Sequence, residues 1–167
     1  MVLIMFAFAF AMIGLMFLYW ELHTAPFRPL QMAIGTRHPN SMPRVIGGRN
    51  RSHRPGSKSI LRMIIVVDYD PTEGLPRPPR PKGSPKDEDD RLVLTKEMVL
   101  DPRVERDYGS LLHLARQTTD LSSYEEIEIF LEHRRPEKSS RTLFAVRAKD
   151  DWFAKYPTDP FAKPDEP

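Results

Sequence analysis

The sequence predicts an α+β protein: a single N-terminal transmembrane helix, then a small domain of about four strands and one covering helix, with proline-rich loops and tail. Three observations predict it. Residues 2–20 carry no charge, an apolar stripe of helical period follows Asp101, and Ile and Glu alternate within residues 124–133. A period near 3.6 indicates a helix, whereas strict alternation indicates a strand with one buried face.

The uncharged run is long enough to cross a bilayer. Its nineteen residues would extend about 28 Å as a helix, close to the roughly 30 Å of the hydrocarbon core. The run closes on Tyr19 and Trp20, whose amphipathic rings are expected at the level of the headgroups. We therefore expect a membrane anchor over 1–22, with Tyr19 and Trp20 as its membrane-interface residues.

A cleaved signal peptide is the alternative interpretation of this run. Such a peptide has a basic start, an apolar stretch of about 7–15 residues and small residues before the cleavage point. No Lys or Arg precedes the run, and a cut after Ala25 would be followed by Pro26 and preceded, two positions earlier, by His23. The sequence favours an uncleaved signal-anchor.

The segment 23–59 is expected to be a basic juxtamembrane linker. It contains five prolines and a pair of glycines without a sustained period. No Asp or Glu lies between Glu21 and Asp68, and Lys and Arg accumulate on the cytoplasmic side of a span. This polybasic pattern predicts a cytoplasmic soluble part and an N-terminus on the opposite side.

Cations immediately beyond a cytoplasmic span are attracted to anionic lipid. The candidate contacts with lipid or a partner are Arg44, Arg49, Arg51, Arg54 and Lys58. The alternative is a solvated topology signal without a binding role. Nucleic acid is not expected as a partner, because the segment lacks interleaved aromatic side chains and no recognition helix follows it.

The small domain is expected over 60–148. Residues 60–69 are rich in β-branched side chains and predict a central strand buried on both faces. A proline-rich surface loop over 71–90 and a second strand over 92–95 should follow. Asp101 and Pro102 are typical of a helix N-cap and first turn, so a helix should extend to about Gln117.

Two further strands are expected to form a hairpin, over 124–133 and 142–148. The tail, 149–167, contains four aromatic side chains among four prolines: Trp152, Phe153, Tyr156 and Phe161. Aromatic side chains are costly to leave in water. They should therefore pack either on the domain or on a partner, and we consider them candidate partner contacts.

Several kinds of chemistry are excluded by composition. The chain has no cysteine, which excludes a disulfide-stapled domain, thiol catalysis and a cysteine-ligated zinc site. No phosphate-binding glycine loop and no nucleophile elbow around a serine is present. We expect no metal, no cofactor and no small-molecule substrate.

One motif points toward an enzyme. The stretch 64–72 is an apolar strand followed by Asp68, Asp70 and Thr72 in the order D-x-D-x-T, which resembles the first motif of the haloacid dehalogenase-like phosphohydrolases. The resemblance implies Asp68 as the nucleophile and Asp70 as the general acid/base, both holding Mg²⁺. That family has a sizeable parallel sheet with crossover helices, whereas here a proline-rich loop follows the motif at once.

The sequence thus predicts a non-catalytic, single-pass membrane-anchored accessory or scaffold protein. Its small domain would be presented at the membrane for protein–protein interaction, and its partners would be the lipid bilayer and another membrane or membrane-associated protein. The alternative is a Mg²⁺-dependent phosphohydrolase that uses Asp68 and Asp70.

Overall fold

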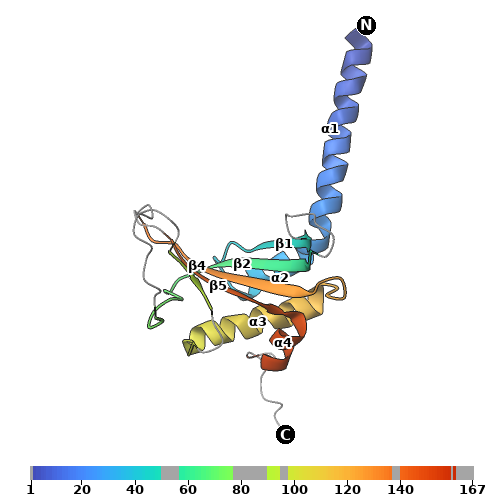
Figure 1. The fold of residues 1–167 in the computed structure, drawn as a ribbon. Helices are drawn as coiled ribbons and strands as arrows, with labels where there is room; N and C mark the ends of the chain where they lie inside the picture. Colours follow the sequence, from blue (N-terminus) through green and yellow to red (C-terminus); the bar gives the residue numbers. More distant parts are fainter. Residues whose placement is uncertain are drawn as a thin grey trace.

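The computed structural model describes residues 2–49, 57–76, 90–94, 98–136, 140–158 and 160. Figure 1 shows a long helix standing away from a mixed α/β body. The elements, in chain order, are α1 (Val2–Thr24), the short 3-10 helix η1 (Ala25–Phe27), α2 (Arg28–Arg37), β1 (Arg44–Arg49), β2 (Ser59–Val67), β3 (Asp90–Val93), α3 (Pro102–Thr118), β4 (Glu126–His133), β5 (Arg141–Ala148) and α4 (Lys149–Lys155). The expected α+β class is confirmed.

The described strands form one five-stranded mixed sheet in the order β1-β2-β4-β5-β3. β1 is antiparallel to β2, β2 is parallel to β4, β4 is antiparallel to β5, and β3 is parallel to β5. The β4–β5 pair is the hairpin expected from the alternating sequence. A parallel pair requires a crossover connection, and the chain between β2 and β4 includes α3.

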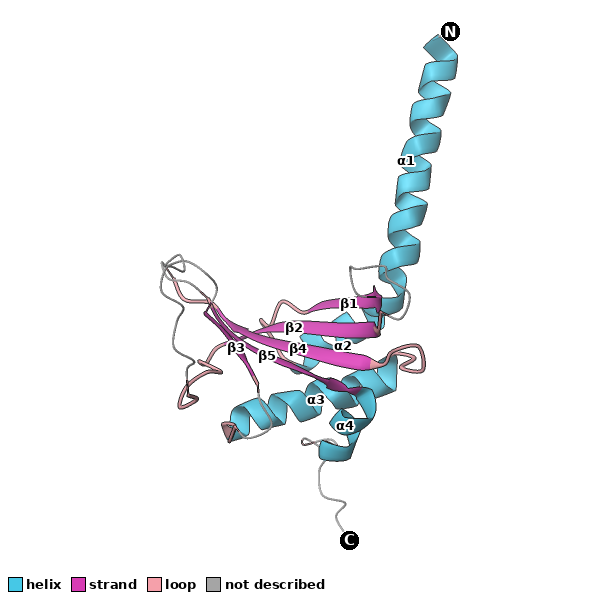
Figure 2. Cartoon of the chain, viewed as in Figure 1, coloured by secondary structure: helices cyan, strands magenta, loops and turns pink. Residues whose placement is uncertain are grey.

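One face of the sheet carries the hydrophobic core. Its alternate side chains, among them Met63, Ile129 and Leu143, are buried against α2, α3 and α4. Figure 2 shows α3 and α4 below the strands and α2 behind them. The apolar stripe expected on α3 is buried as a unit: Val104, Tyr108, Leu111, Leu112 and Ala115 are all 0% exposed. The helix contributes to the core in the way that its period predicted.

The start of α3 follows its sequence signal closely. The Asp101 carboxylate accepts a hydrogen bond from the Arg103 backbone N–H at 2.8 Å, and Pro102 occupies the first turn. An Asp N-cap satisfies a backbone donor that has no partner within the helix. The helix ends at Thr118, one residue beyond the expected end.

The domain contains more elements than the expected four strands and one covering helix. Both α2 and β1 lie within 23–59, where we expected a linker, and Leu30, Ile34 and Val45 from this segment are core residues. Pro29 did not exclude a helix because it lies in the first turn of α2, where proline is tolerated. Gly47 and Gly48 lie on an edge strand.

One local expectation also needs correction, and the tail adds a helix. β2 alternates between fully and partly buried residues instead of being buried on both faces, because described helices cover only one side of the sheet. The third covering helix, α4, lies in the tail and begins after Ala148, with Asp150 and Asp151 in its first turn and no side-chain cap. Residues 77–89 of the proline-rich loop lie outside the described residues.

Trp152 attaches α4 to the sheet. Its side chain is 0% exposed and its indole N–H donates to the Ile127 carbonyl at 2.9 Å. We expect Trp152→Ala to lower the free energy of unfolding of the full chain in detergent by about 3–5 kcal/mol, because a large buried side chain is lost. Chemical denaturation followed by circular dichroism measures the change.

Phe153→Ala is the matched control, since Phe153 is only half-buried and should cause a smaller loss. A loss below about 1 kcal/mol for Trp152→Ala would contradict the assignment of α4 to the core, because that is the range of peripheral substitutions.

Candidate functional site

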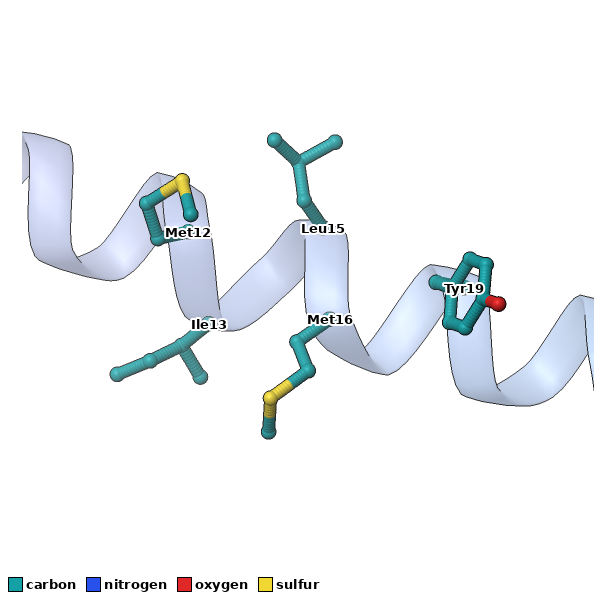
Figure 3. Close-up of a pocket in the computed structure, with 5 residues that line it drawn as sticks. All are labelled: Met12, Ile13, Leu15, Met16 and Tyr19. Carbon is teal, nitrogen blue, oxygen red and sulfur yellow. The ribbon is translucent and has the colours of Figure 1, made fainter.

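Helix α1 exposes apolar side chains in every direction. From Ile4 to Trp20 its large hydrophobic side chains are 50–73% exposed. Figure 3 shows Leu15 pointing to one side of the helix and Ile13 and Met16 to the opposite side. A helix that lies on a protein surface has one apolar stripe, whereas a helix that is apolar all round needs an apolar surrounding. By length and composition α1 can cross a membrane.

The base of α1 is joined to the domain by packed structure. The Arg28 guanidinium binds the Glu21 carboxylate through two hydrogen bonds of 3.0 Å, which bridge η1. Phe27 packs over Gly47 of β1, where a Cβ atom would lie 2.6 Å from the Phe27 ring and closer still to the Tyr124 hydroxyl. Only glycine allows this approach without displacement of both rings.

Beyond this contact, α2 is anchored in the core. Leu30 and Ile34 are each 0% exposed. Full burial of such a side chain contributes about 1.5–3 kcal/mol, so the two together hold α2 on the sheet by roughly 3–6 kcal/mol. The apolar helix therefore continues directly into a core element.

The second face of the sheet is not covered by any described helix. An apolar row crosses it through four strands: Ile64 on β2 pairs with Phe130 on β4, Phe130 with Phe144 on β5, and Phe144 with Val93 on β3. The two Phe rings stack with centroids 4.5 Å apart. Val93 is 53% exposed and Val146 is 38% exposed. We call this surface the open sheet face.

A charged pair flanks the apolar row. The Arg62 Nε atom donates to Glu128 Oε2 at 2.6 Å, and the Arg62 guanidinium lies 5.3 Å from the centre of the Phe130 ring. Glu128 is 7% exposed, although the sequence placed it on a wet face with Glu126. The positive charge of Arg62 offsets the cost of burying the Glu128 carboxylate, a cost that an isolated buried carboxylate would bear in full.

A cluster of polar side chains is buried where α2 meets α3. The His38 Nε2 atom lies 3.0 Å from Ser110 Oγ, and its Nδ1 atom lies 3.9 Å from Asp107 Oδ1. Tyr69 donates from its hydroxyl to Asp107 Oδ2 at 2.6 Å. Ser110 is 1% exposed, so its hydroxyl does not reach solvent. The cluster, which resembles a Ser-His-Asp arrangement in composition, joins helices within the interior.

Sequence reasoning missed this cluster. Asp107 lies three residues after Val104 and four before Leu111, so it falls on the apolar stripe of α3. A polar residue on a buried stripe needs a hydrogen-bonding partner, and that was the available signal. Asp107 accepts its hydrogen bond from Tyr69, whereas His38, which bonds Ser110, comes from a segment that we expected to be a linker.

The two carboxylates of the phosphohydrolase-like motif are not equivalent. Asp68 is exposed just after β2. Asp70 accepts hydrogen bonds from the Thr72 N–H at 3.0 Å and from the Thr72 hydroxyl at 2.7 Å, and it forms an ion pair with Arg141. Burial alone would raise the pKa of Asp70, but the Thr72 hydrogen bonds and the Arg141 guanidinium outweigh it and hold this pKa below its ordinary value.

These contacts engage Asp70 within its own loop and with β5. Within the described part of the chain, no group of three or more His, Asp or Glu side chains could hold a metal ion. The alternative of a phosphohydrolase that uses Asp68 and Asp70 stays a prediction.

The predicted basic contacts fall into two groups. Arg44 and Arg49 lie on β1 and are exposed, whereas Lys58 is paired with Glu126. Arg51 and Arg54 lie outside the described residues.

The four tail aromatics are also separated. Trp152 is buried in the core, Phe153 lies under the Arg116 guanidinium at 4.2 Å, and Tyr156 stacks near Trp152 with ring centroids 5.9 Å apart. These three side chains therefore pack on the domain itself. Phe161 lies outside the described residues.

No protein-family model matches the chain, and no curated protein or solved structure is significantly similar to it.

His38 predicts a pH dependence of stability. Burial lowers its pKa below the ordinary value of 6.5; Asp107 opposes this shift, and Arg37 and Arg106 add to it. Between the lowered pKa and pH 6.5 the unfolded chain binds more protons than the folded one. The free energy of unfolding should therefore stay at its maximum above pH 6.5. As the pH drops below 6.5 it should decrease, by at most about 1.4 kcal/mol per pH unit for this single proton.

Denaturation of the full chain in detergent tests this expectation. The measurements extend from pH 7.5, about one unit above the ordinary pKa of histidine, to pH 5, about 1.5 units below it. His38→Gln should flatten the dependence, whereas the control His113→Gln should retain it. An unchanged slope in His38→Gln would assign the pH dependence to other groups.

Proposed function

We propose that the protein is a non-catalytic, single-pass membrane-anchored scaffold that holds its α+β domain at the membrane surface and binds another protein there. The observation that carries this proposal is the direct connection of an all-round apolar helix to a core element of the domain. α1 exposes its apolar side chains, and α2 follows after the three residues of η1. A domain attached in this way stays close to the surface of the bilayer.

The open sheet face is the surface that we assign to the protein partner. It offers an apolar row from Ile64 to Val93 beside the balanced Arg62–Glu128 pair. Interfaces between proteins commonly combine an apolar, aromatic centre with a polar rim. An exposed apolar surface of this kind, rimmed by charge, is typical of an interaction site.

Substitutions on the open sheet face test the partner. The double variant Val93→Lys/Val146→Lys places two charges beside the Phe130–Phe144 stack. Both positions are exposed, so the lysine side chains can reach solvent without disturbing the core. We expect purification of the full chain from its native membranes in mild detergent to recover a stoichiometric partner. The double variant should bind this partner at least about tenfold more weakly, a change of about 1.4 kcal/mol in binding free energy.

Val99→Lys is the matched control, because Val99 is 90% exposed and lies outside the sheet. Circular dichroism must show that all variants fold. Retention of the partner by the double variant would remove the open sheet face from the interface. Migration of the wild-type chain as a lone monomer in every detergent would remove the scaffold proposal itself.

A separate experiment tests the side of the membrane. Lys and Arg without acids between Glu21 and Asp68 favour a cytoplasmic domain. A C-terminal tag should therefore be protected from protease in intact cells and cleaved in inverted vesicles. Cleavage in intact cells would place the domain on the opposite side.

A further inference from the structure

The junction fixes the height of β1 relative to the apolar helix. Glu21 and Arg28 bridge η1 from both ends, and Phe27 packs over Gly47 in the middle of β1. Four residues separate Trp20 from Thr24, and η1 has three more. At about 1.5 Å per α-helical and about 2.0 Å per 3-10 residue, β1 lies within about 12 Å of the level of Trp20.

That height lies at the outer boundary of the headgroups. A bilayer of about 40–45 Å with a hydrocarbon core of about 30 Å has a headgroup layer of roughly 5–7 Å on each side. With Trp20 at the headgroup level, β1 is then no more than about one Debye length, about 8 Å, from the lipid phosphates. At that distance salt screens the charges on β1 only in part, so they can still interact with the lipid.

The direction of β1 keeps both of its ends at this height. Figure 1 shows β1 running across the direction of α1, with α3 and α4 on the far side of the sheet from α1. β1 is also an edge strand, paired only with β2 in the described sheet. Arg44 and Arg49 lie at its two ends, five residues apart, so their side chains leave opposite faces of the sheet. Because β1 is the edge strand, both long side chains can reach the same layer of lipid from the two sides of this edge.

The charges on β1 are suited to that layer. Arg44 and Arg49 are exposed, and neither has a carboxylate partner among the described residues. By contrast, Arg28 is paired with Glu21 and Lys58 with Glu126. No acid occurs from residue 22 to residue 67, so no carboxylate from α2, β1 or β2 lies beside the two arginines.

An apolar side chain accompanies them. Ile46 is 54% exposed and lies two residues from Arg44, on the same face of β1. A guanidinium binds phosphate through two parallel hydrogen bonds, and an isoleucine next to it can enter the boundary between headgroups and acyl chains.

We propose that the edge strand β1 binds anionic lipid headgroups through Arg44 and Arg49, with Ile46 inserted beside Arg44, so that the domain lies against the bilayer. This inference rests on the proposed function, because it requires α1 within the membrane. Arg44 pairs with Ile64 at the β1 end of the apolar row, so the protein partner is left with the part of the row on β4, β5 and β3.

A single cysteine can report the contact, since the natural chain has none. Ile46→Cys in the full chain is labelled with a fluorophore and reconstituted in vesicles that contain headgroup-attached quenchers. One set of vesicles is phosphatidylcholine alone; in the other, phosphatidylglycerol replaces a third of it. We expect strong quenching in the anionic vesicles, weak quenching in the neutral ones, and loss of the difference at high salt.

Removal of the two charges supplies the decisive comparison. Each Arg near an anionic surface contributes about 1 kcal/mol, so Arg44→Gln/Arg49→Gln should lower the ratio of bound to unbound positions by about 30-fold. The matched variant Arg116→Gln/Lys155→Gln, on α3 and α4, should leave it unchanged. A label at Asp150→Cys on α4 should remain unquenched in both vesicles.

Equal quenching at position 46 in both vesicles, or unchanged quenching in Arg44→Gln/Arg49→Gln, would overturn the proposal. Alkaline carbonate extraction separates this failure from failure of the anchor. If α1 resists extraction while the label at 46 stays unquenched, only the lipid contact of β1 is wrong. If carbonate releases the chain, the anchor and the lipid contact fall together.

Discussion

The packing of Phe27 over Gly47, with α2 buried behind it, is the contact on which the arrangement of this protein depends. It converts an exposed apolar helix and a small α+β domain into one continuous structure. Without it, a flexible linker would connect the domain to α1, and its end-to-end distance would grow with the square root of the number of residues. With it, the position of every surface of the domain relative to α1 is determined.

The sheet then divides the domain into two sides with different properties. The helices bury one face, where Met63, Ile129 and Leu143 contribute to the core. The other face retains the Phe130–Phe144 stack and the Arg62–Glu128 pair, which are partly accessible. A domain of this size still exposes roughly a third of the surface of its unfolded chain, so apolar surface of this kind stays accessible.

The buried polar cluster adds specificity at the same junction. His38 follows α2, whereas Asp107 and Ser110 lie on α3, so the hydrogen bond between His38 and Ser110 aligns α2 with the main helix of the domain. Buried polar groups stabilise a structure only when their partners are in place. The cluster therefore favours one packing of α2 over others that would bury the same apolar side chains.

The sequence by itself determined the elements with strong local signals. The apolar run, the Asp101 N-cap with its stripe to Ala115, and the alternation that makes β4 were all predictable because each depends on neighbouring residues. Only the tertiary structure decided the roles of 23–59 and of Trp152, because α2 and β1 are too short to be stable alone and form on the core. The open sheet face, the pairing of His38 with Asp107 and the height of Arg44 and Arg49 depend likewise on contacts between residues distant in the chain, which no local pattern records.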